Sequence, residues 1–110
     1  MFTISEPDWK LFRRLQPIAL DRFCQRVLAE IDYIASNADK THHDRYLATF
    51  QLIKQRDKEL ANMFDDLRRS TAIHQLAHIQ SHSLLTPEEM SNFSTGIQDA
   101  VRFLLGTEPN

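Results

Sequence analysis

Three histidines recur every four residues, at His74, His78 and His82. On a helix, imidazoles at this spacing lie on successive turns of one side, where two of them can bind the same metal ion. Three in a row drift by about 80° around the axis, so one ion would take two and find further ligands elsewhere. No Asp or Glu lies inside this ladder, so the HExxH pattern of metalloproteases is absent. The ladder predicts either a divalent-metal site or a polar helix face exposed to solvent or to another subunit.

Asp57 is a second candidate, because it places a carboxylate inside an apolar stripe. At about 100° per residue it lies within about 40° of Ile53, which belongs to that stripe. Because an isolated buried charge is costly, Asp57 is predicted to be an interior polar residue paired with an arginine, or to lie exposed at a bend. The candidate partners are Arg13, Arg14 and Arg56. A binding or catalytic acid is the remaining alternative.

Arginines near the N-terminus form a third group. Arg22 and Arg26 are one helical turn apart, and Tyr33 follows farther along the same side. Guanidinium groups bind carboxylates and phosphates in bidentate fashion, so these residues are predicted to bind a partner, with a solvated helix face as the alternative. Together with Arg13 and Arg14 they also allow a weaker hypothesis of nucleic-acid binding, which the formal net charge of −2 does not favour.

Familiar catalytic motifs are missing from the sequence. With two glycines in 110 residues, the chain has no P-loop, no GxGxxG, no GxSxG, no CxxC and no EF-hand loop. Its single cysteine, Cys24, lies among apolar residues and indicates a small buried hydrophobe in a reducing compartment. An enzymatic function is therefore less favoured than a binding function.

The bulk composition predicts one globular domain over residues 1–110. A hydrophobic fraction of 42% and a charged fraction of 25% are ordinary for soluble proteins of this length. No stretch approaches the roughly 18 apolar residues of a membrane span, and the first residues lack the layout of a secretion signal. We expect a cytoplasmic protein without a membrane partner.

Capping signals and apolar periodicity predict an all-α helical bundle of five or six helices. Helix starts are marked by Ser/Thr-x-x-Asp/Glu boxes at residues 5–8, 41–44 and 86–89. Pro17 should break or kink the first helical segment. Gly96 leaves open a division of the last segment into 87–93 and 96–105. The predicted helices cover about 6–15, 17–36, 42–68, 71–83 and 87–105.

The apolar pattern changes phase just after Leu67. In an unbroken helix, the side that carries Ile53 and Leu67 would next present the histidine ladder, while Ile73 and Leu76 would point the opposite way. Either the chain turns near 68–71, or one long helix changes the side that it buries. The long helix would measure about 63 Å and would need a second subunit to cover it. Both alternatives stay open at this stage.

From these patterns we expect a non-enzymatic helical module for protein–protein interaction or regulation that self-associates, with a homodimer as the expected assembly. The expectation of self-association depends on the two apolar sides around residue 70. One alternative is a metal-binding enzyme or sensor that uses the His74, His78 and His82 ladder. A weaker alternative is a nucleic-acid-binding regulator that uses the N-terminal arginines. No cofactor is predicted apart from the divalent metal of the first alternative.

Overall fold

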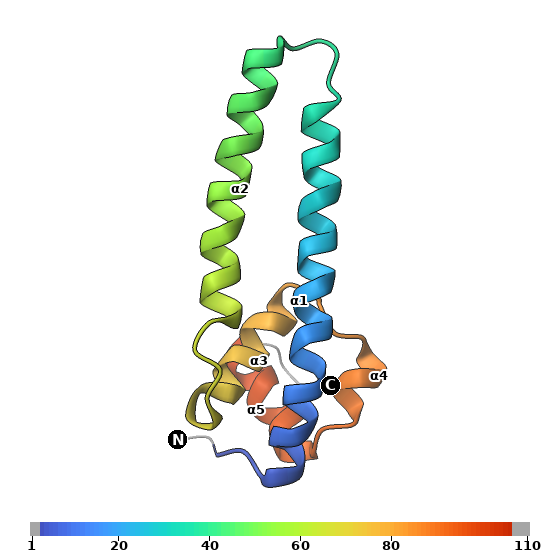
Figure 1. The fold of residues 1–110 in the computed structure, drawn as a ribbon. Helices are drawn as coiled ribbons and strands as arrows, with labels where there is room; N and C mark the ends of the chain where they lie inside the picture. The colour runs from blue at the N-terminus through green and yellow to red at the C-terminus, as the bar shows by residue number, and fades with distance from the viewer. Residues whose placement is uncertain (1–2, 107–110) are drawn as a thin grey trace.

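A computed structural model describes residues 3–106, and over this range the chain forms α-helices and one 3-10 turn with no β-strand. The predicted all-α class is confirmed. In chain order the elements are α1 (Glu6–Ala35), α2 (His42–Phe64), the 3-10 turn η1 (Arg69–Thr71), α3 (Ala72–Ser81), α4 (Pro87–Ser91) and α5 (Thr95–Leu105). Figure 1 shows α1 and α2 as a long antiparallel hairpin, with α3, α4 and α5 gathered around its lower end.

The hairpin makes the molecule elongated. Its principal extents are 52 × 31 × 21 Å and its radius of gyration is 16.9 Å, whereas a compact domain of this length measures about 13 Å. No side chain between residues 24 and 62 is buried. We call residues 24–60 the arm, and we call the remainder of the described chain the base. The structure is therefore a helical base with a two-helix arm rather than one uniform bundle (Figure 1).

The hydrophobic core lies entirely in the base. Its buried side chains come from the first half of α1, the end of α2, and the segment from α3 to α5. The largest fully buried side chains are Phe12, Met63, Leu76, Ile79 and Leu84. Because α3 contributes a buried residue at almost every turn, it is the central helix of this core.

The capping boxes begin helices where the sequence predicts. The hydroxyl groups of Ser5, Thr41 and Thr86 accept hydrogen bonds from backbone N–H groups three residues later, at 3.4, 3.0 and 3.0 Å. Ser94 caps a further start, since its hydroxyl accepts from the N–H of Ile97 at 3.4 Å. The last segment is thus divided into α4 and α5, as one of the two alternatives predicts, and a single helix over 87–105 is wrong.

The predicted break at Pro17 does not occur. Helix α1 runs from Glu6 to Ala35 with Pro17 inside it, so the separate helices 6–15 and 17–36 are one. Pro17 and Arg13 are both exposed, which leaves the Arg13 carbonyl that loses its N–H donor open to water. On the opposite side, Leu15 and Ala19 are buried in the core, which fixes this part of α1 against the base.

The phase change after Leu67 is a turn, and the long-helix alternative is wrong. Helix α2 ends at Phe64, four residues before the predicted 68, and Asp66 takes a left-handed conformation with φ of 62°. The next helix, α3, spans 72–81 rather than 71–83, and its apolar side is buried in the base. The second apolar side expected near residue 70 is therefore covered within one chain, and it supplies no argument for self-association.

Candidate functional site

Polar contacts tie the two helices of the arm together along one side. Arg56 of α2 donates two hydrogen bonds to the carboxylate of Glu30 of α1, at 3.1 and 3.0 Å, and it also pairs with Glu59 at 2.9 Å. The hydrogen bonds to Glu30, with those to Glu59, raise the pKa of Arg56 above its ordinary value. Nearer the tip, Arg45 donates to the carbonyl oxygen of Ala35 at 2.9 Å. We call this the polar side of the arm.

The opposite side of the arm carries large apolar groups in contact with solvent. Tyr46, Phe50 and Ile53 of α2 are 67%, 52% and 47% exposed, and Leu28 of α1 is 61% exposed. At about 100° per residue, Phe50 points about 120° away from Arg56 on the same helix. By the same arithmetic, Leu28 points about 160° away from Glu30. Within the arm, the hydrogen bonds and ion pairs that join α1 to α2 in the structure of residues 3–106 are those of Arg56 with Glu30 and of Arg45 with Ala35.

We call this side the apolar face. Its members are Cys24, Leu28 and Ile31 of α1 and Tyr46, Phe50 and Ile53 of α2. The other large apolar side chains exposed in residues 3–106 lie at the edge of this face or elsewhere: Ile18, Tyr33, Leu47, Leu67 and Phe103. Scattered exposed apolar residues are normal, whereas a contiguous group along two helices marks a surface used for contact.

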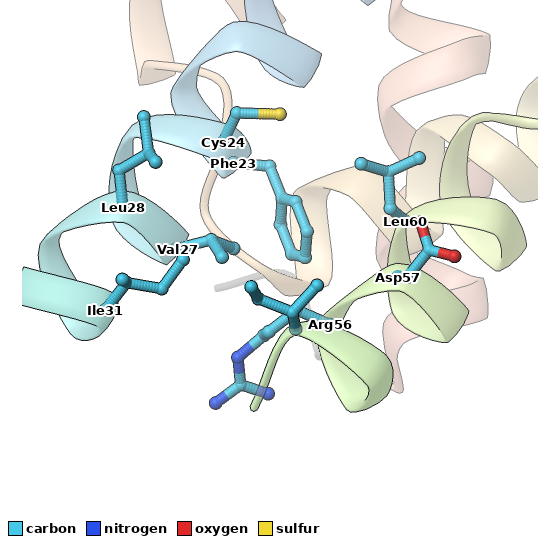
Figure 2. A pocket seen from close by; sticks show the side chains of 9 residues that line it. Phe23, Cys24, Val27, Leu28, Ile31, Arg56, Asp57 and Leu60 are labelled. Carbon is cyan, nitrogen blue, oxygen red and sulfur yellow. The ribbon is translucent and has the colours of Figure 1, made fainter. Parts of the chain in front are cut away.

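A groove of about 290 Å³ runs between the two helices at the base end of the apolar face. Figure 2 shows Val27, Leu28 and Ile31 along its α1 wall and Leu60 on its α2 wall, with the ring of Phe23 between the walls. Its complete lining is Phe23, Cys24, Val27, Leu28, Ile31, Ile53, Arg56, Asp57 and Leu60. The groove is therefore almost wholly apolar and suits an apolar side chain better than a polar ligand.

Asp57 lies at the rim of this groove and is exposed, so its prediction as an interior polar residue is wrong (Figure 2). The helical arithmetic placed Asp57 correctly within the apolar stripe. The stripe itself faces solvent in the arm, because no third helix covers it. Of the alternative that Asp57 lies exposed at a bend, the exposure is correct, while α2 does not end there but continues to Phe64.

The α2 side of the apolar face has the spacing of a coiled-coil seam. Tyr46, Phe50, Ile53, Asp57 and Leu60 follow one another at alternating intervals of four and three residues. Only the base end of the seam, at Leu60, packs against the core. A seam of this kind normally contacts another helix along its whole length.

Arg22 and Arg26 were predicted to bind a partner, but the structure directs both into the base. Arg22 donates to the two carboxylate oxygens of Glu89 at 2.6 and 3.0 Å and to the Leu84 carbonyl at 2.9 Å. This pairing lowers the pKa of Glu89 to about 2. Arg26 donates to the backbone carbonyls of His82 and Ser83. Their role is to fasten α1 to the segment after α3.

Tyr33, the third residue of that predicted group, is 80% exposed on the arm. It lies about 60° from Glu30 and about 140° from Leu28, and therefore toward the polar side. The arginines offered for nucleic-acid binding, Arg13 and Arg14, are exposed on α1, where the guanidinium of Arg13 lies 5.8 Å from the ring centroid of Trp9.

The histidine ladder is brought together only in part. The rings of His78 and His82 lie 5.6 Å apart between centroids, and His82 also meets Phe23 edge-on at 6.1 Å. His74 is exposed. Within residues 3–106 no group of three or more His, Cys, Asp or Glu side chains is placed to hold a metal ion. The metal hypothesis remains a prediction that rests on the His78 and His82 pair.

Asp8 has a role that the sequence reasoning missed. Only 5% of it is exposed, and its carboxylate accepts hydrogen bonds from the Ser94 N–H at 3.0 Å, the Ser94 hydroxyl at 2.7 Å and the Ser5 hydroxyl at 2.9 Å. Burial raises the pKa of Asp8, but the hydrogen bonds from Ser94 and Ser5 together outweigh it and lower the pKa. Asp8 thereby joins the start of α1 to the start of α5.

Comparisons of this chain with protein-family models, with curated proteins and with solved structures found no match. None of the helices in residues 3–106 is both long enough and apolar enough to cross a membrane. The functional argument therefore depends on the geometry of the arm.

Proposed function

We propose that this protein is a non-enzymatic interaction module that self-associates through the apolar face of its arm. One observation carries the proposal: Leu28, Tyr46, Phe50 and Ile53 are between 47% and 67% exposed along one side of a two-helix arm whose other side is closed by ion pairs. The second copy is the proposed occupant of this face.

A two-helix arm has a simple physical reason to pair with another. Helices in proteins gain most of their stability from packing an apolar side, and two helices alone leave part of that side in water. Two arms placed face to face form four antiparallel or parallel helices around one core, which is a common stable arrangement. A two-fold interface requires a patch that complements itself, and the apolar faces of two copies meet that condition.

The size of the face also fits a second copy. The α2 part of the arm, from residue 42 to residue 60, is about 28 Å long, and two helices side by side are about 20 Å wide. The resulting footprint of roughly 550 Å² lies near the upper range of apolar patches on monomers. This outline, which includes polar side chains, is smaller than the ~800 Å² that each partner buries in a standard interface, so a weak dimer is expected.

The chemistry of the groove supports binding rather than catalysis. Arg56 is already engaged by Glu30 and Glu59. Cys24 has no histidine among the residues that line the groove. A nucleophile without an adjacent base lacks the usual means of activation.

Sedimentation velocity and light scattering test the proposal. The protein concentration should run from about 1 to about 100 micromolar, the range in which weak dimers form and dissociate. Wild-type protein is expected to pass from monomer to dimer as concentration rises. Phe50→Glu places a charge in the centre of the apolar face and should leave a monomer throughout. Tyr33→Glu is the matched control, because it changes an exposed aromatic residue of the same arm toward the polar side.

Circular dichroism should show that both variants keep the helical content of the wild type. A wild-type protein that stays monomeric at the highest concentration would overturn the proposal. Loss of the dimer in Tyr33→Glu but not in Phe50→Glu would overturn the assignment to the apolar face.

A further inference from the structure

Two polar residues on the exposed side of α2 lie at equal distances from Phe50. His43 lies seven residues before it and Asp57 seven residues after it, and both are exposed. Positions at equal distances on either side of one residue meet when a helix packs against an antiparallel copy of itself.

We infer that two arms dock antiparallel, with the two-fold axis at Phe50 and with Asp57 of each copy opposite His43 of the partner subunit. This inference rests on the proposed self-association and adds its orientation and register. The same alignment sets Phe50 beside Phe50 of the partner subunit, so apolar groups meet at the centre and polar groups at the ends.

Charge favours this orientation over the parallel one. A parallel two-fold pair of face-to-face arms would set α2 against α1 of the partner subunit and keep Asp57 about 21 Å along the helix from the level of the partner's His43. In the antiparallel pair, Asp57 instead faces a histidine in the first turn of α2, where the helix begins at His42. The N-terminus of a helix carries partial positive charge, which stabilises a nearby carboxylate. Asp57 thus gains two favourable neighbours that one copy alone does not provide.

Disulfide trapping distinguishes the two orientations. The variants are His43→Cys and Asp57→Cys, each made in a Cys24→Ala background so that no other thiol is present. In the antiparallel dimer, position 43 of one copy lies near position 57 of the other, whereas two copies of position 43 are separated by about 21 Å of helix. A disulfide requires Cα atoms within about 7 Å. Mild oxidation should therefore cross-link the mixture of the two variants but neither variant alone.

Non-reducing gels measure the cross-linked fraction, and mass spectrometry identifies the joined peptides. The mixture should give dimers in which the peptide containing position 43 is joined to the peptide containing position 57. When both variants also carry Phe50→Glu, the cross-linked fraction should fall to about a tenth or less, on the order expected for random collision. Light scattering on the Cys24→Ala background shows whether it still dimerises.

The outcomes separate this inference from the function on which it rests. Efficient cross-linking of either single variant with itself would overturn the inferred orientation and register. A dimer by light scattering without cross-linking in the mixture would overturn the register and leave the proposed function standing. A wild-type protein that stays monomeric by light scattering would overturn both.

Discussion

Single polar side chains hold distant parts of the base together. Arg22 reaches Glu89 across 67 residues of sequence, and Asp8 reaches Ser94 across 86. The sequence predicts the capping role of each carboxylate, since Glu89 closes the capping box of Thr86 and Asp8 follows Ser5 at the capping interval. It does not predict their long-range partners, Arg22 and Ser94, because local spacing does not indicate which helices pack against one another. Arg22 was for this reason assigned to an external partner.

Glu89→Gln should destabilise the fold by about 1–2 kcal/mol, because two charge-assisted hydrogen bonds to Arg22 become weaker or are lost. Urea unfolding at pH 7 measures the change. Asp99→Asn is the control, since it removes the exposed ion pair of Asp99 with Arg102, and exposed pairs contribute about 0.5 kcal/mol or less. Equal effects from the two substitutions would contradict a special contribution from Glu89.

The same contact sets a pH dependence whose sign follows from linkage. The pKa of Glu89 falls from 4.5 to about 2 on folding, so the folded state favours the ionised carboxylate. Its stabilisation is complete above pH 4.5 and is lost as pH falls from 4.5 toward 2. The difference in unfolding free energy between wild type and Glu89→Gln should therefore be constant near neutral pH and shrink below pH 4.5. A difference that grows on acidification would contradict the assignment.

At the scale of helices, the sequence predicts starts better than interruptions. Each start depends on a hydroxyl group and an N–H three residues away, which is a local event that short spacing captures. Whether a helix continues through Pro17 depends instead on whether water can reach the freed carbonyl and whether neighbouring side chains are held in a core. The turn at Asp66 likewise lacks glycine or proline, so only the change of apolar phase indicates it.

Pro17→Ala should stabilise the protein by about 1–3 kcal/mol, because it restores an N–H donor for the Arg13 carbonyl and removes the clash of the proline ring. Thermal unfolding followed by circular dichroism should show a higher melting temperature. Pro87→Ala is the matched control: Pro87 is the first residue of α4, where the missing N–H costs nothing, so no gain is expected there. An unchanged or lower melting temperature for Pro17→Ala would show that the core depends on the proline conformation.

At the scale of the whole molecule, the base and the arm differ in how well they are covered. Among the described residues, buried side chains are confined to the base, and the arm, residues 24–60, has none. The sequence shows the apolar stripes of both arm helices but not their exposure, since periodicity alone cannot distinguish a stripe facing a core from one facing water. This is why Asp57 was predicted to be interior and why the apolar face was not foreseen.

Hydrogen exchange should show a gradient of protection along the molecule. In dilute solution, amides of α3 should exchange slowest and those of the arm near its tip fastest, because local opening is easiest where few apolar contacts hold a segment. Raising the concentration should slow exchange in the arm alone, and Phe50→Glu should abolish this effect. Protection that rises equally in α3 and in the arm would indicate association through another surface.

Helices α3, α4 and α5 all lie around one end of the hairpin, far from its tip (Figure 1). Two copies joined through antiparallel arms would therefore form an elongated particle, with one base at each end and a four-helix rod between them. The outward surfaces of the two bases would be identical and would stay exposed to solvent. The two bases of such a particle would be held at a separation fixed by the length of the arm.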